Sequence, residues 1–79
     1  MKVYKLKTPR NLYRNSKGAK IVTRYVTEDG QYLICRLKDP IFDYYLGWEI
    51  TMKNGKHYHS YTSCGIADIC EAEGWELEK

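Results

Sequence analysis

The chain has 79 residues, 43% of them hydrophobic and 29% charged, and a formal net charge of +3. We expect a single domain over residues 1–79, because this length leaves no room for a second one. The core must be thin, which argues against a large enclosed active site with its own lid and cofactor domain. No apolar run approaches the roughly 20 residues that cross a bilayer, so no membrane partner is expected.

The net charge conceals an uneven distribution along the chain. Residues 1–26 carry eight basic and no acidic side chains, whereas residues 27–79 carry five basic and ten acidic ones, a local +8 against −5. A basic segment of this kind attracts an anionic partner, or the acidic surface of another copy of the chain. A solvated basic segment without any specific ligand is an equal alternative.

The cysteines and the start of the chain indicate the compartment. Cys35, Cys64 and Cys70 are an odd number and lack the spacing of a disulfide framework. Residues 1–7 alternate charged and apolar side chains and lack the apolar stretch of a secretory signal. We therefore expect a reduced protein in the cytoplasm, with cysteines that mainly fill the core.

The first elements in chain order are a strand and a long loop. Residues 2–7 alternate in polarity, which predicts a short strand. Residues 8–19 contain Pro9, Asn11, Asn15, Ser16 and Gly18, a composition typical of an irregular loop. Loops of this length in small domains are often functional.

A first hairpin is predicted from residues 21–27 and 31–37, which flank the turn signal Asp29-Gly30. The expected pairs are Val26 with Leu33, Arg24 with Cys35, and Val22 with Leu37. One face then collects Val22, Val26, Leu33, Cys35 and Leu37 together with Arg24. The other, amphipathic face holds Thr23, Tyr25, Thr27, Tyr32, Ile34 and Arg36.

A second hairpin is predicted from residues 45–52 and 57–62 around Asn54-Gly55. Its expected pairs are Met52 with His57, Ile50 with His59, and Trp48 with Tyr61. These pairs are expected on one face together with Leu46. The opposite face would hold Glu49, Thr51, Tyr58 and Ser60. A register error of one residue would exchange the two faces, so this assignment depends on the type of turn.

A helix is predicted over residues 64–73, with Ser63 as its N-cap and Gly74 at its end. Residues 75–77 then return to the sheet as a short strand. The expected fold class is α+β: an antiparallel sheet of four or five strands built from two hairpins, with one C-terminal helix packed on one face.

Basic residues interleaved with tyrosines are the main candidates for a binding site. Cations neutralise phosphates and phenol rings stack on bases, so such a surface suits a nucleotide or nucleic acid. The candidate ligand-binding residues are Lys5, Lys7, Arg10, Tyr13, Arg14, Arg24, Tyr25, Tyr32, Arg36, His57 and His59. The alternative is that small β domains place tyrosines at the edges of the core. Thr62, Ser63 and Gly65, at the start of the expected helix, form a weaker phosphate-binding candidate.

The histidine pair and the nearby cysteines raise the question of metal or catalytic chemistry. His57 and His59 are two residues apart on a strand and point to one side, with Cys64 and Cys70 following. Their spacing matches no zinc ribbon or finger, so no metal is expected. No general base, nucleophile and orienting group can be named together, so no catalytic residue and no cofactor are predicted. A small Cys/His enzyme that uses Cys64 or the pair His57 and His59 ranks last, because a thiol at a helix start is activated but no base can be named for it.

The acidic end of the chain offers a different kind of interface. Asp68, Glu71, Glu73, Glu76 and Glu78 could imitate phosphates and occupy a nucleic-acid channel of a partner protein. The alternative function is therefore a protein-binding inhibitor.

In size, single free-standing domain, segregated charge and its eight tyrosines, the chain resembles small phage-encoded proteins that counter bacterial defence. These include anti-CRISPR inhibitors and proteins that sequester nucleotide signals. The resemblance implies a viral antagonist acting in the host-cell cytoplasm, and it assigns no role to any residue. We expect a non-enzymatic protein that binds an anionic ligand. We also expect a homo-oligomer, because thin cores and exposed strand edges are commonly stabilised by association.

Overall fold

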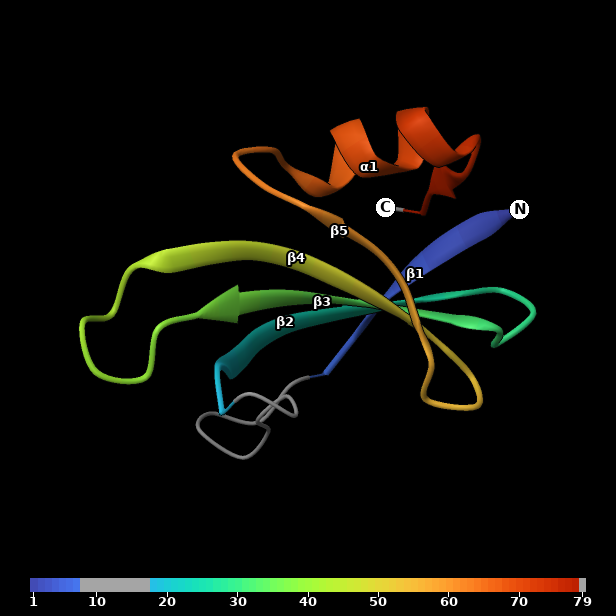
Figure 1. Ribbon diagram of the computed structural model, residues 1–79. Coiled ribbons are helices and arrows are strands. Elements are labelled where there is room, and N and C mark those ends of the chain that lie inside the picture. The colour runs from blue at the N-terminus through green and yellow to red at the C-terminus, as the bar shows by residue number, and fades with distance from the viewer. Residues whose placement is uncertain (8–17, 79) are drawn as a thin grey trace.

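The computed structural model describes residues 1–7 and 18–78. Its elements are β1 (Lys2–Leu6), β2 (Lys20–Thr27), β3 (Tyr32–Lys38), β4 (Tyr45–Met52), β5 (His57–Tyr61), α1 (Ile66–Glu73) and β6 (Glu76–Leu77). The described residues form one sheet in the order β5-β4-β3-β2-β1-β6, and α1 lies over one of its faces (Figure 1). The expected sheet with one C-terminal helix is confirmed, but six strands exceed the predicted four or five. The loop predicted over residues 8–19 falls almost wholly outside the described residues.

The β2–β3 hairpin forms around the predicted turn. Asp29 fixes this turn, because its Oδ1 accepts hydrogen bonds from the Thr27 hydroxyl at 2.7 Å and the Gln31 amide at 3.0 Å. Near the turn the predicted register is confirmed, since Val26 pairs with Leu33 and Arg24 with Cys35. Farther away it is wrong: Ile21, not Val22, pairs with Leu37, because a β-bulge leaves Val22 without an opposite residue.

The β4–β5 hairpin also contains a β-bulge that breaks the predicted register, here next to the turn. Ile50 pairs with His59 and Trp48 with Tyr61, as predicted, but His57 pairs with Thr51 instead of Met52. The bulge at Tyr58 moves this side chain away from the face predicted for it. Its hydroxyl donates a hydrogen bond of 2.8 Å to Glu73 Oε1 on α1, so Tyr58 lies on the side of the sheet that the helix covers.

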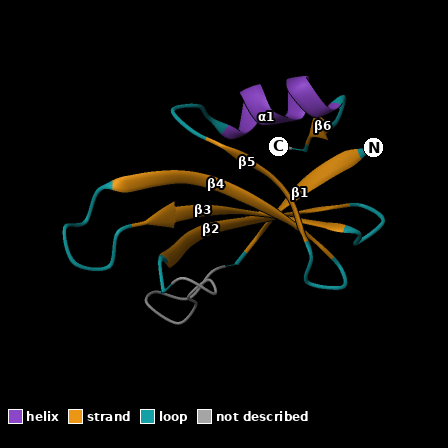
Figure 2. Cartoon of the chain, in the orientation of Figure 1, coloured by secondary structure: helices purple, strands orange, loops and turns teal. Residues whose placement is uncertain are grey.

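The connection between β3 and β4 is a firmly held loop of residues 39–44. Asp39 Oδ1 accepts hydrogen bonds from the amides of Ile41 and Phe42, at 2.8 and 2.7 Å, and the Asp39 amide donates to the Tyr44 carbonyl oxygen. Asp43 adds an ion pair with Lys38 at 3.2 Å. Figure 2 shows this loop projecting at the end of the sheet remote from the N and C termini.

The helix α1 begins later than predicted. Gly65, not Ser63, is its N-cap, and Asp68 Oδ2 accepts a hydrogen bond from the Gly65 amide at 3.0 Å. Ser63 cannot serve as the cap because the backbone turns there through φ 45°. The predicted end is confirmed, since Gly74 closes the helix in the left-handed conformation with φ 77°. No helix in the described part of the chain is long and apolar enough to cross a membrane.

After α1 the chain returns to the opposite edge of the sheet, where β6 runs parallel to β1. The sheet is therefore mixed and not wholly antiparallel as predicted, because the helix carries the chain back across the sheet before its last strand. The Glu76 amide donates to the Met1 carbonyl oxygen, and the Glu78 amide donates to the Val3 carbonyl oxygen, both at 2.9 Å. The crossover therefore joins the two ends of the described chain (Figure 1).

The core lies between α1 and the face of the sheet that the sequence marks as amphipathic. Its buried residues are Val3, Ile34, Trp48, Ile50, Ile69 and Cys70, with Tyr25, Tyr32, Tyr61 and Trp75 packed at its border. The more apolar set with Val26, Leu33 and Leu37 faces the other way and is half-buried. Aromatic side chains thus close the rim of a core with few aliphatic residues.

Candidate functional site

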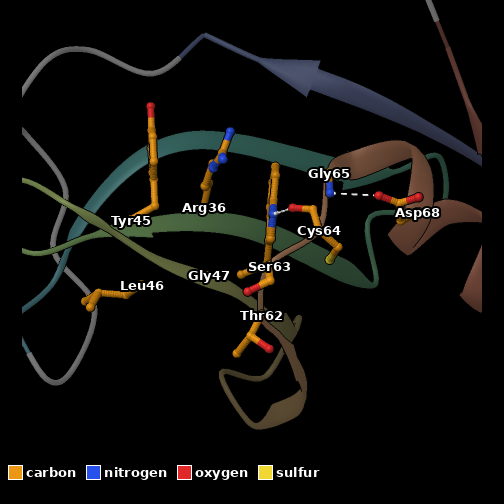
Figure 3. Close-up of a pocket in the computed structure, with 10 residues that line it drawn as sticks. Arg36, Tyr45, Leu46, Gly47, Thr62, Ser63, Cys64, Gly65 and Asp68 are labelled. Atoms are coloured by element: carbon orange, nitrogen blue, oxygen red, sulfur yellow. Dashed lines mark hydrogen bonds between the residues drawn. The ribbon is translucent and has the colours of Figure 1, made fainter.

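A pocket of about 560 Å³ opens where the loop end of β3 and β4 meets the start of α1. Its lining comes from three stretches far apart in sequence: Arg36 from β3, residues 45–48 from β4, and residues 62–65 with Asp68 from the β5–α1 region. Figure 3 shows these side chains around the pocket. The site therefore exists only in the folded sheet with its helix in place.

Arg36 is the central cationic group of this pocket. Its guanidinium carbon lies 3.9 Å from the centroid of the Tyr45 ring and 5.4 Å from that of the Trp48 ring. Figure 3 shows the Tyr45 and Arg36 side chains standing side by side. Contact with two rings restricts the guanidinium to one position, and the rings attract its charge.

Bulge geometry brings both rings to Arg36. Lys38 pairs with Tyr45 and Leu37 with Gly47, so Leu46 is an extra residue in β4. Without a bulge, Tyr45 and Trp48 would point to opposite faces, because they are three residues apart. The extra residue reverses the alternation and places both rings on the face of Arg36.

The polar groups of Arg36 are incompletely satisfied. Among residues 1–7 and 18–78, the Nε of Arg36 is the one buried side-chain nitrogen or oxygen atom that has no hydrogen-bond partner. The described residues also provide no carboxylate in ion-pair distance of its guanidinium. An arginine held by rings, without a protein carboxylate, is suited to accept an external anion.

The opposite wall is the connection from β5 to α1. Trp48 Nε1 donates a hydrogen bond of 2.8 Å to the Cys64 carbonyl oxygen, which ties this connection to the sheet. Ser63 is exposed beside it, in a conformation with positive φ. The wall thus contains the residues Thr62, Ser63 and Gly65 that the sequence marked as a phosphate-binding candidate.

Charges of both signs surround the pocket. Lys38 Nζ lies 5.3 Å from the Tyr45 ring centroid, so a second cation stands near Arg36, although it is paired with Asp43. Asp68 contributes a carboxylate to the lining and already occupies the Gly65 amide. An anion bound near Arg36 therefore gains mainly from Arg36, because Asp43 offsets Lys38, and it is opposed by Asp68.

Those of the predicted ligand-binding residues that the structure describes lie on more than one face of the sheet. Arg24 lies on the face opposite Arg36, where its Nη2 donates to the Lys7 carbonyl oxygen at 3.0 Å. Lys5 is exposed on β1 and is paired with Tyr25 across the strands. Arg10, Tyr13 and Arg14 lie outside the described residues. Of the predicted set, Arg36 lines the pocket.

Tyr25 and Tyr32 are engaged within the protein. The Tyr25 ring lies 6.1 Å from that of Trp48, and the Tyr32 ring lies 4.7 Å from that of Tyr58. A further contact of 5.4 Å joins Tyr32 to Trp75. Both tyrosines therefore close the rim of the core, which is the alternative role that the sequence left open.

His57 and His59 lie exposed on the edge strand β5. His57 Nε2 is 2.8 Å from Ser60 Oγ, and the His59 ring meets the edge of the Tyr61 ring at 4.6 Å between centroids. Among the described residues, no group of three or more His, Cys, Asp or Glu side chains is arranged to hold a metal ion.

The acidic residues proposed for an interface have different surroundings. Glu73 accepts hydrogen bonds from the hydroxyls of both Tyr58 and Tyr61, and the bond to its carboxylate raises the pKa of Tyr61 to about 12. Asp68 caps α1, and Glu78 forms a 3.6 Å ion pair with Lys2. Glu71 and Glu76 are exposed.

The three cysteines are free, and two of them are buried. Burial raises the pKa of the Cys35 thiol to about 11, and it also raises the pKa of Cys70. These two thiols are therefore protonated and act as packing groups. Half-buried Cys64 is the cysteine that lines the pocket.

The sequence interpretation missed Tyr45, Leu46 and Gly47 as parts of the site. A lone glycine inside a strand pattern is a known sign of a bulge, and Gly47 carried that signal.

Comparison of this chain with protein-family models, with curated proteins and with solved structures finds no match.

Proposed function

We propose that this chain is a non-enzymatic binding protein that holds the anionic group of a small ligand, such as a nucleotide, against Arg36. The observation that carries this proposal is the Arg36 guanidinium, placed between the Tyr45 and Trp48 rings without a described carboxylate partner. Because its position is already fixed, little side-chain entropy is lost when an oxyanion binds.

The pocket has the size and lining that a small ligand needs. Its volume of about 560 Å³ falls within the roughly 300–1,000 Å³ of small-molecule sites. The Tyr45 ring is largely exposed, so a planar base has an aromatic surface beside the cation. Ser63 and Thr62 add hydroxyls on the far wall. The lining residues offer binding groups rather than a nucleophile paired with a base.

The resemblance to phage anti-defence proteins supports a specific biological role for such binding. A protein that sequesters a nucleotide signal needs no catalysis, only a preformed anion site. We therefore propose sequestration of an anionic host metabolite as the role of the pocket.

Calorimetric titration tests the site, with inorganic phosphate and nucleoside mono-, di- and triphosphates as ligands at low salt. We expect Arg36→Gln to weaken binding at least about 10-fold, because a charge-assisted hydrogen bond is lost. Lys56→Gln is the matched control: it removes one positive charge from an exposed residue at the β4–β5 turn, and binding should be unchanged. Added salt should weaken the wild-type affinity.

A substitution of Asp68 is expected to change the affinity in the opposite direction. Asp68→Ala removes the carboxylate that opposes the anion, so affinity should rise although the helix cap is lost. Circular dichroism confirms that each variant is folded. No detectable binding of any of these ligands by the wild type, or equal losses in R36Q and K56Q, would contradict the proposed function.

A further inference from the structure

The β3–β4 loop and the first two residues of β4 carry a concentration of exposed apolar side chains. Ile41 is 80% exposed, Phe42 75%, Tyr44 54%, Tyr45 55% and Leu46 41%. Scattered apolar residues are normal on a protein surface, but five large ones in six consecutive positions form a patch of the kind that marks an interaction site.

The loop is built to present these side chains rather than left unstructured. The Asp39 carboxylate binds the amides of Ile41 and Phe42, and the Asp39 carbonyl oxygen accepts the Asp43 amide at 3.2 Å. The backbone amides at the tip are therefore already satisfied and lose nothing when water is excluded. A fixed loop also loses little conformational entropy on association.

The loop carries few charges, and most of them are occupied within it. Lys38 offsets Asp43 in an ion pair, and the Asp39 carboxylate keeps its charge while it accepts hydrogen bonds from backbone amides. A second copy that approaches through this loop therefore meets an apolar tip flanked by one uncompensated carboxylate. An anionic lipid surface is a poorer fit, because two carboxylates belong to the loop.

From these observations we infer that the β3–β4 loop is the surface through which two copies of this chain associate. At roughly 200 Å² for each large side chain, the exposed parts of the five residues amount to roughly 600 Å². Two copies together then bury roughly 1,200 Å², the lower end of the range for specific interfaces. A two-fold axis at the loop makes this surface self-complementary, apolar tip against apolar tip.

This inference goes beyond the proposed function and does not depend on it, because it concerns the unliganded chain. Tyr45 and Leu46, at the start of β4, belong both to this apolar patch and to the lining of the pocket. Association through the loop therefore brings two Arg36 pockets close to one axis.

Sedimentation equilibrium of the full chain at micromolar concentration tests the inference. We expect a species of twice the 9.3 kDa chain mass. Phe42→Asp should weaken association at least about 30-fold, the effect of removing an interface anchor. Met52→Asp is the control: it places the same charge on an exposed apolar residue at the other hairpin and should leave the dimer intact. Circular dichroism should show both variants folded, since both side chains are exposed.

Oxidative cross-linking shows whether the loops face each other. Phe42→Cys should form a covalent dimer under mild oxidation, whereas Met52→Cys should not. A strictly monomeric wild type, or a dimer that persists in F42D, would overturn the inference. If the monomer instead binds lipid vesicles or another protein through this loop, the inference is also overturned and the surface belongs to that partner.

Discussion

Arg24 and Arg36 show how residues of similar appearance in the sequence acquire different roles. Both are arginines on the first hairpin, and both were expected to contribute to one anion-binding surface. The pairing of Arg24 with Cys35 and of Thr23 with Arg36 places them on opposite faces. Arg36 lies beside two aromatic rings that belong to β4. The charge could be predicted from the sequence, whereas the ring neighbours come from a strand that follows an irregular loop.

The hydrogen bond between Tyr61 and Glu73 predicts a pH dependence of stability. The hydrogen bond to Glu73 raises the pKa of Tyr61 from 10.0 to about 12. The unfolded chain therefore loses this proton first as the pH rises, so the stabilisation is complete below pH 10 and is lost between pH 10 and about 12. Tyrosinate absorbance should show Tyr61 titrating late in the folded protein, with the pKa of Tyr58 also raised by its hydrogen bond to the same carboxylate.

Two variants make this test specific. Tyr61→Phe should remove the late step, and Glu73→Gln should move it to lower pH, because a neutral amide no longer opposes the phenolate. The unfolding free energy of E73Q should decline less than that of the wild type over this pH range. An unchanged late step in Y61F would show that another tyrosine is responsible.

At the scale of strands, β-bulges explain most of what the sequence could and could not predict. The turn Asp29-Gly30 sets the predicted register for the pairs next to it. Around Asn54-Gly55 the predicted pair next to the turn is wrong, and the predicted register holds only beyond the bulge. Extra residues at Val22, Leu46 and Tyr58 then reverse the alternation of faces. A period of two cannot reveal where one residue is inserted, because the inserted residue depends on contacts with the neighbouring strand.

Replacement of Gly47 tests the importance of the bulge in β4. Its φ of 112° disfavours any side chain, and a Cβ there would collide with the carbonyl oxygen of Tyr61 on β5. We expect Gly47→Ala to lower the unfolding free energy by about 2–4 kcal/mol, measured by urea denaturation, because strain and a backbone clash combine. It should also weaken phosphate binding, since the bulge positions Tyr45.

Gly55→Ala is the matched control. Gly55 has a similarly positive φ of 87°, but open space surrounds its Cβ position. Its replacement should cost only about 1–2 kcal/mol, from backbone strain alone. Equal losses in the two variants would argue against the close approach of β4 and β5 at Gly47.

The sequence placed the start of α1 too early because a contact with the sheet overrides the local preference. Serine is a strong N-cap, and Ser63 precedes the apolar periodicity. The hydrogen bond from Trp48 Nε1 to the Cys64 carbonyl oxygen holds the chain against the sheet for two more residues. The tertiary contact therefore overrides the local preference, and the same contact shapes the wall of the pocket.

For the molecule as a whole, the crossover through α1 and β6 connects both edges of the sheet. Trp48 lies in the core below the β5–α1 connection, and Trp75 packs near β6 against Tyr32. A small domain with one such core should unfold in a single transition. In Trp48→Phe and in Trp75→Phe, the fluorescence midpoint of the remaining tryptophan in urea should coincide with the circular dichroism midpoint of that same variant. An earlier change at Trp75 would show that β6 and α1 detach before the sheet unfolds.

The parallel pairing of β6 with β1 also has a consequence for synthesis on the ribosome. The strands β1 to β5 are complete by Tyr61, yet the outer edge of β1 has no neighbour until Glu76 and Leu77 emerge. During translation the nascent chain therefore exposes an open strand edge and an uncovered core, the state most prone to aggregation. The last residues of the sheet to be made are the ones that seal its first strand.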